Sequence, residues 1–171
     1  MPKRASRNHS PNQIPFRYKT AYAAILFLSL IWCSLFVGVP FLTEGGPFSR
    51  RVATIITLFF SPVCHQTPDR SFHLLGNPLA VCARCTGIYG GFLVGVVVYP
   101  FLRRLEGGVR PPRWILGAGV LPTGVEILLS RLRVISPDPL LRGPTGLILG
   151  GVVAFYVLPA VFELVDHPKK T

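Results

Sequence analysis

The sequence predicts an all-α integral membrane protein, a bundle of four transmembrane helices with one short half-inserted or interfacial helix. Half of its 171 residues are hydrophobic and only 15% are charged, and the mean hydropathy is +0.48. That is more apolar material than the core of one soluble domain of this size needs. A bilayer core about 30 Å thick requires roughly 20 mostly apolar residues of α-helix, and several stretches of the chain approach or exceed that length.

Four stretches are predicted to cross the bilayer, namely residues 21–42, 86–102, 114–130 and 144–165. The first carries no charge and is too long for the apolar region of a signal peptide. Residues 52–63 are also apolar, but this 12-residue stretch makes only about 18 Å of helix. It is therefore predicted to be the short half-inserted or interfacial helix. Residues 21–166 then form a single membrane domain in which residues 64–85 are a motif-bearing loop.

The basic residues predict the orientation in the membrane. The chain has 18 Lys and Arg residues against 7 Asp and Glu residues, which gives a net charge of +11. The basic residues flank apolar stretches and have no interleaved aromatic residues, so no nucleic-acid partner is expected. Residues 1–20 carry Lys and Arg and no acid, and are predicted to be a disordered cytoplasmic tail. Residues 167–171 form a second cytoplasmic tail. The loop 64–85 is then expected at the outer face, with the lipid bilayer as partner and protein partners left open.

Small residues recur at every fourth position of two predicted spans: Gly87, Gly91 and Gly95 in one, and Gly146, Gly150 and Ala154 in the other. Such faces let helix backbones approach closely in lipid. We therefore expect these two helices to pack against each other. Glycine is common in membrane helices, but two such patterns in one small protein favour a packing role. They indicate nothing about chemistry.

The residues able to do chemistry gather in the motif loop, where Cys64 and His65 precede the Cys82–Cys85 pair. Thiolates and imidazole are the ligands that suit zinc or copper. The start of a predicted helix and the intervening Arg84 both favour thiolate at this pair. Two other hypotheses fit the same residues. In the first, Cys64 and one cysteine of the pair form a redox centre or a structural disulfide, because disulfides persist outside the cytoplasm. In the second, the thiols are buried and pack as small apolar side chains.

Glu126 lies in an apolar run of the third predicted span, where an unpaired charge costs at least about 2.5 kcal/mol. It therefore needs a partner or a proton. It is expected on the same side as the cysteines, together with Arg70, Arg84, Arg131 and Arg142. Glu126 is either a ligand or proton carrier that supports the site, or the partner of one of these arginines in a structural ion pair. Cys33, in the middle of the first span, is interpreted as a packing residue.

Three sequence blocks in the motif loop, residues 64–66 (CHQ), 70–72 (RSF) and 81–89 (VCARCTGIY), resemble the signature of domain-of-unknown-function family 2085. The resemblance continues into later blocks around Glu126 and residues 141–150, and so covers about residues 52–151. The family consists of predicted prokaryotic membrane proteins. The resemblance therefore implies a location in the cell (plasma) membrane of a prokaryote, and it implies no established activity.

The preferred hypothesis is an integral membrane protein that binds zinc or copper at one membrane face through Cys64, His65, Cys82 and Cys85. One alternative is a membrane thiol/disulfide redox protein that uses Cys82 and Cys85 with Cys64 as the resolving thiol. Another is a non-catalytic membrane component with a structural disulfide. The sequence has no Gly-rich phosphate loop, no Ser/His/Asp set and no dinucleotide fingerprint, so no nucleotide or flavin is expected. Enzymatic activity is left open.

Overall fold

The computed structural model describes residues 16–103, 111–136 and 138–166. In chain order its elements are α1 (Phe16–Thr43), α2 (Pro47–Phe60), the 3-10 turn η1 (Pro68–Arg70), β1 (His73–Leu74), β2 (Asn77–Pro78), α3 (Ala83–Leu102), α4 (Arg113–Arg131) and α5 (Pro139–Asp166). The two short strands pair antiparallel within the motif loop. The predicted all-α class is confirmed.

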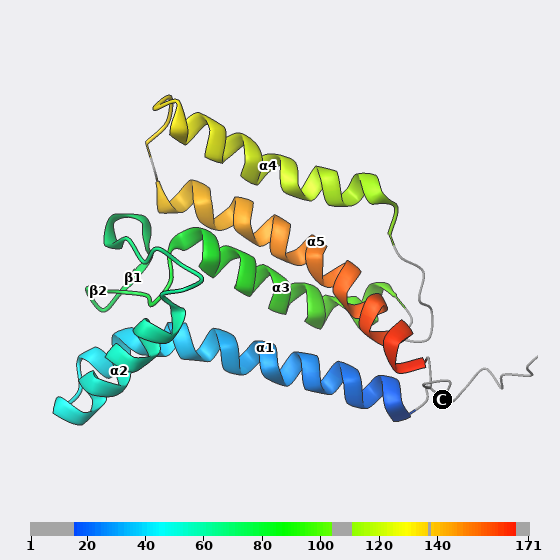
Figure 1. Cartoon of the computed structure of the whole chain (residues 1–171), viewed down its shortest axis with the longest axis horizontal. Helices are drawn as coiled ribbons and strands as arrows, with labels where there is room; N and C mark the ends of the chain where they lie inside the picture. The colour runs from blue at the N-terminus through cyan, green and yellow to red at the C-terminus, as the bar shows by residue number, and fades with distance from the viewer. Residues whose placement is uncertain (1–15, 104–110, 137, 167–171) are drawn as a thin grey trace, which may run out of the picture.

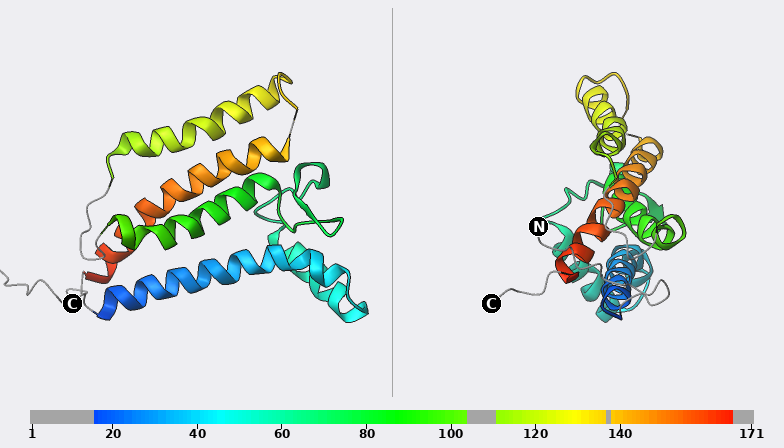
Figure 2. Two further views of the ribbon diagram at one scale, coloured as in Figure 1. Left: turned by 180° about the vertical axis from the view of Figure 1, so that it is seen from behind. Right: turned by 90° about the vertical axis from the view of Figure 1, so that its right-hand side faces the viewer.

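The four long helices lie side by side, in the order α1, α3, α5 and α4 (Figures 1 and 2). α3 and α5 run in the same direction, and α1 and α4 run in the opposite one. The start of α1 and the end of α5 are therefore at one end of the bundle. The motif loop, α2 and the turn between α4 and α5 are at the other, which we call the motif end.

Three of these helices, α1, α3 and α5, are long and apolar enough to cross a membrane. α4 has 19 residues, about 28 Å of helix, but polar residues such as Thr123 and Glu126 lower its hydropathy. It is not among the candidate spans found in the described part of the chain. Three of the four predicted spans thus have support, whereas the crossing of residues 114–130 and the interfacial position of α2 stay predictions.

Helices α1 and α2 begin earlier than the apolar stretches that predicted them. α1 begins at Phe16 and not at residue 21, and Tyr18 in its first turn packs edge-on against Phe162, with ring centroids 5.7 Å apart. α2 begins at Pro47 and not at residue 52, because proline suits the first turn of a helix. Hydropathy marks the apolar part of a helix and misses such end turns. Residues 16–20 of the first predicted tail belong to α1. Residues 1–15 of that tail, and the second predicted tail at 167–171, lie outside the described residues.

α3 and α5 pack backbone to backbone through small residues. All five glycines that the sequence singles out lie in this contact and are buried: Gly87, Gly91, Gly95, Gly146 and Gly150. A Cβ on Gly91 would overlap the carbonyl oxygen of Leu147, and one on Gly150 would overlap that of Ile88. Only glycine permits so close an approach. The contact therefore fixes the motif ends of α3 and α5 next to each other.

Buried apolar side chains form two clusters, one toward each end of the bundle. The cluster at the motif end includes Phe36 of α1, Phe60 of α2 and Val81 of the loop, and Cys64 belongs to it. The other includes Tyr99 of α3 together with buried residues of α5. The motif end is thus packed around a cysteine, although it lies at the tip of the bundle.

Candidate metal centre

Three of the four cysteines meet at the motif end. The Sγ atoms of Cys64, Cys82 and Cys85 all lie within 4.8 Å of one another. Cys64 follows α2, Cys82 is the residue before α3, and Cys85 is in the first turn of α3. Thiolates bound tetrahedrally to zinc at about 2.3 Å are about 3.8 Å apart. The three sulfurs therefore need to move little to bind one ion.

Gln66 holds the two halves of this cluster together. Its side-chain amide donates hydrogen bonds to the carbonyl oxygens of Thr57 in α2 (2.6 Å) and Ala80 before α3 (2.8 Å). Its backbone has a positive φ of 50°, which turns the chain directly after Cys64. Gln66 was given no role from the sequence, although a residue two positions after a cysteine can direct its backbone N–H to the sulfur.

Backbone N–H groups and neighbouring thiols donate hydrogen bonds to two of these sulfurs, those of Cys64 and Cys82. Cys64 Sγ accepts hydrogen bonds from the backbone N–H of Cys82 (3.2 Å) and of Gln66 (3.5 Å). Hydrogen bonds from Cys64 and Cys85 hold the pKa of the Cys82 thiol well below its usual range. The backbone N–H groups of Cys85 and Arg84 lower this pKa further, and together these hydrogen bonds outweigh burial, which raises it. The start of α3 acts in the same direction, because a helix N-terminus stabilises thiolate.

The surroundings of the cluster are apolar. Cys64 is only 7% exposed, and the rings of Phe36, Phe60, Trp32 and Tyr89 pack around this region, with the Trp32 and Phe60 centroids 5.0 Å apart. Burying thiolates among apolar groups is costly unless a cation compensates their charge. The site thus combines groups that favour thiolate with surroundings that require a positive partner.

The prediction of a disulfide is wrong for this structure. All four cysteines lie among the described residues, and all four are free. The prediction relied on an expected outer, oxidising location. In the structure three sulfurs approach one another together, whereas a disulfide would pair two of them at about 2.05 Å and leave the third alone.

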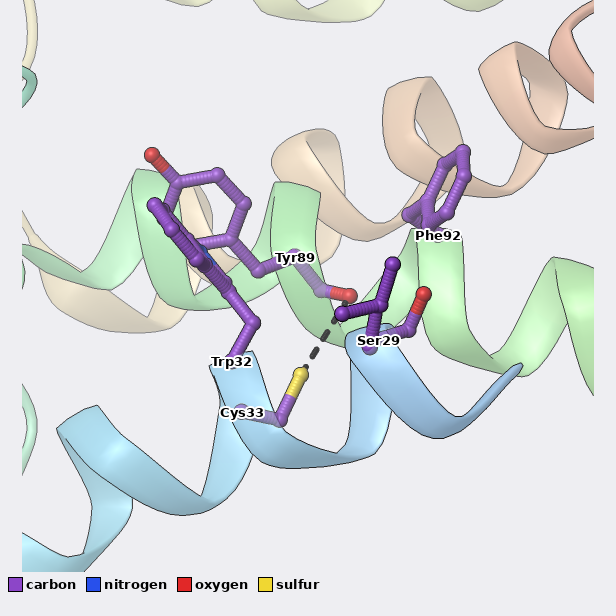
Figure 3. A pocket seen from close by; sticks show the side chains of 6 residues that line it. Ser29, Trp32, Cys33, Tyr89 and Phe92 are labelled. Atoms are coloured by element: carbon purple, nitrogen blue, oxygen red, sulfur yellow. Dashed lines mark hydrogen bonds between the residues drawn. The ribbon is translucent and has the colours of Figure 1, made fainter. Parts of the chain in front are cut away.

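Cys33 lies apart from the cluster, on α1. Its thiol points toward α3 and donates to the carbonyl oxygen of Tyr89 at 3.6 Å (Figure 3). With Ser29, Trp32 and Phe92 it lines an apolar pocket of about 280 Å³ between the two helices. Its surroundings are those of a packing residue.

His65, the fourth predicted ligand, is not brought into the three-sulfur group. Its side chain is exposed, whereas that of the preceding Cys64 is buried. His65 lines a second, larger pocket beside the cluster, together with Arg70 and Arg84. The two adjacent residues therefore face different surroundings.

Glu126 pairs with two arginines. Its carboxylate is buried, accepts a hydrogen bond from Arg84 of α3, and accepts others from Arg142 Nε of α5 (3.1 Å) and from Ser130 Oγ (2.9 Å). Of the two interpretations made from the sequence, the structure shows an ion pair, with two partners where one was expected. Because Glu126 belongs to α4, this triad connects three helices at the motif end. Arg70 lies in the neighbouring pocket.

The motif and the triad both lie in a segment that matches a known family. Residues 64–156 match the model of DUF2085, described as a predicted membrane protein. The chain belongs to this family. That confirms the resemblance found in the sequence, and it supports a membrane location for this DUF2085 protein.

Two archaeal relatives are similar to the DUF2085 protein. An uncharacterized protein of Methanocaldococcus jannaschii is 37% identical over 150 residues, which are 86% of this chain and 96% of the relative. An uncharacterized protein of Methanothermobacter thermautotrophicus is 40% identical over 48 residues, 28% of this chain and 42% of the relative. No solved structure matches the chain.

Proposed function

We propose that this DUF2085 protein is an integral membrane protein that binds a zinc or copper ion at one membrane face through Cys64, Cys82 and Cys85. The observation that carries the proposal is the approach of three thiols within 4.8 Å of one another. The N–H donors at Cys64 support it, because they stabilise negative charge on the sulfur. The apolar surroundings support it as well, because thiolates buried there need a cation to compensate their charge.

The ligand chemistry favours soft or borderline ions. Thiolates select Zn²⁺ or Cu⁺ over hard cations such as Mg²⁺ and Ca²⁺, which require oxygen ligands. Three protein ligands also leave one tetrahedral position of zinc open, as in sites where the metal meets water or another molecule. A metal-handling site, one that exchanges or presents its ion, follows more naturally from this arrangement than a closed structural site.

We further propose that α4 also crosses the membrane, which gives four spans in all. It lies along α5, and Thr123 Oγ1 donates to the carbonyl oxygen of Thr145 at 3.0 Å. The apolar Leu121, Val125 and Leu128 are exposed, which suits contact with lipid. The ion pairs of Glu126 remove the main electrostatic obstacle to placing this helix in a bilayer.

Helix α2 is proposed to lie at the membrane interface. Its 14 residues span about 21 Å, too short for a crossing. Phe48, Ile55 and Phe59 share one face of the helix and are exposed, a pattern typical of interfacial helices. With four spans and the basic N-terminal segment in the cytoplasm, both termini are cytoplasmic, and the cysteine cluster is at the outer face of a prokaryotic plasma membrane.

The proposal is tested by the metal content of purified protein. We expect about one zinc or copper ion per chain in the wild type, measured by elemental analysis in detergent. Cys64→Ser and Cys85→Ser should each lose most of the ion, and the matched control Cys33→Ser should retain it, because Cys33 contacts Tyr89 and not the cluster. Wild-type protein without metal, or equal loss in Cys33→Ser, would refute the metal site.

A further inference from the structure

A second polar site lies beside the cysteine cluster, in a pocket of about 1100 Å³ at the motif end. The motif loop, α3, α4, the turn after α4 and α5 all contribute to it. Its lining includes five arginines: Arg70, Arg84, Arg131, Arg133 and Arg142. None of its described lining residues is acidic. The pocket brings together positive charges that are far apart in the sequence.

The buried Glu126 compensates only part of this charge. It pairs with Arg84 and Arg142, so five guanidinium groups share one carboxylate. Asp69 and Asp138 lie near in sequence, but both are exposed and neither lines the pocket. Such an excess of one charge in a concave site concentrates ions of the opposite sign.

The triad also fixes how the arginines present their donors. Glu126 engages one nitrogen each of Arg84 and Arg142, whereas a guanidinium has five N–H donors. The Nε atom of Arg84 is buried and has no hydrogen-bond partner in the described part of the chain. The ion pairs hold these side chains in place and leave donors for a ligand.

Arg133 occupies a backbone position that usually belongs to glycine. The N–H of Val134 bonds to the carbonyl of Leu129 (3.0 Å) and that of Arg133 to the carbonyl of Ser130 (3.3 Å), the pattern of a Schellman cap. Arg133 has a φ of 57°, a conformation that costs a non-glycine residue free energy. An arginine at this position destabilises the cap relative to glycine. We therefore expect the Arg133 side chain to have a role that is separate from capping the helix.

We propose that this pocket binds a ligand that carries phosphate groups. Guanidinium groups bind phosphate through paired charge-assisted hydrogen bonds, and the pocket is far larger than one phosphate group. Ile127, Val134 and Ile135 line it as well, so it also offers apolar contact to the rest of the molecule. A phosphate ester in solution and the headgroup of an anionic phospholipid share this chemistry.

Arg133→Gly provides the test, since it removes a pocket arginine and places the preferred residue in the cap. In neutral detergent, calorimetric titration with pyrophosphate tests the soluble source. Native mass spectrometry with phosphatidylglycerol against phosphatidylcholine tests the lipid source. We expect wild-type protein to bind pyrophosphate, or to retain phosphatidylglycerol selectively, and Arg133→Gly to weaken that binding about tenfold with an unchanged or higher melting temperature.

Arg50→Gln is the matched control, because Arg50 is an exposed arginine of α2 outside the pocket and its loss changes the net charge equally. It should leave affinity unchanged. Binding of neither probe, equal weakening by Arg50→Gln, or undiminished binding in both Arg133→Gly and Arg70→Gln would overturn the proposal. Metal content in the same samples reports separately on the cysteine cluster.

Discussion

The cysteine cluster and the arginine pocket lie at the same end of the bundle, but their polar groups are compensated in opposite ways. The three thiols are packed among aromatic and aliphatic side chains, with backbone N–H groups as donors to Cys64. The arginines surround an open pocket, and a single buried carboxylate pairs with two of them. The chemistry of the first site suits a cation, and that of the second suits an anion. According to the two proposals, neighbouring sites at the motif end would therefore bind ligands of opposite charge.

The largest expected effect concerns the carboxylate that supports the arginines. Glu126→Gln keeps the shape of the side chain but leaves the buried Arg142 without a counter-ion. The free energy of unfolding should fall by about 3–5 kcal/mol, measured by denaturation in mixed micelles. Ser130→Ala, which removes one hydrogen bond to the same carboxylate, should cost only about 1 kcal/mol. Equal losses in the two variants would mean that the charge is not what stabilises the triad.

Removing metal should act on the other site alone. An ion present at 100 times its dissociation constant stabilises the folded state by about 2.7 kcal/mol. A chelator should therefore lower the melting temperature of the wild type and of Arg70→Gln, and should have no effect on Cys82→Ser. A chelator response that persists in Cys82→Ser would place the ion elsewhere.

The glycine contact between α3 and α5 should matter more to the arginines than to the thiols. Gly91→Ala introduces a Cβ that overlaps the backbone of Leu147, and should cost about 2 kcal/mol. Gly90→Ala is the matched control, since its Cβ meets nothing within 4 Å and alanine favours helix. The resulting shift of α3 against α5 should weaken pyrophosphate binding and leave the metal content unchanged, because α5 provides Arg142 and no cysteine. Loss of metal in Gly91→Ala alone would contradict this separation.

The smallest expected effect is at Gln66. Gln66→Leu removes both side-chain hydrogen bonds that link Thr57 and Ala80 and should cost about 1 kcal/mol in stability, with a several-fold loss of metal affinity in a competition assay. Asn77→Ala removes an exposed amide of the same loop, which donates to Glu44, and should leave metal affinity unchanged. Similar affinities for both variants would show that Gln66 does not position Cys64.

Local sequence signals predicted the elements better than the sites. The length of the apolar stretches predicted the long helices, and the four-residue glycine spacing predicted the residues that lie between α3 and α5. Both signals can be recognised within a single segment of the sequence. Spacing placed Cys82 and Cys85 near Cys64, but it did not show that His65 is exposed and lies outside the three-sulfur group. Which way adjacent side chains point depends on the turn at Gln66.

The arginine pocket was missed for a different reason. From the sequence, Arg70, Arg84, Arg131 and Arg142 were expected on the same side as Glu126, but Arg133 was given no role and no pocket was expected. The pocket exists because the motif loop, the start of α3 and the turn after α4 meet, and no local pattern records that meeting. The signal available in the sequence was the pair Arg131 and Arg133, at and just after the end of α4.

The coordination shell of the ion tests the central claim most directly. X-ray absorption spectroscopy of the wild-type protein in detergent should show one zinc or copper ion with three sulfur ligands, at about 2.3 Å for zinc, and Cys33→Ser should give the same spectrum. A shell of nitrogen and oxygen without sulfur, or thiols joined in a disulfide at about 2.05 Å, would contradict a metal centre built from Cys64, Cys82 and Cys85.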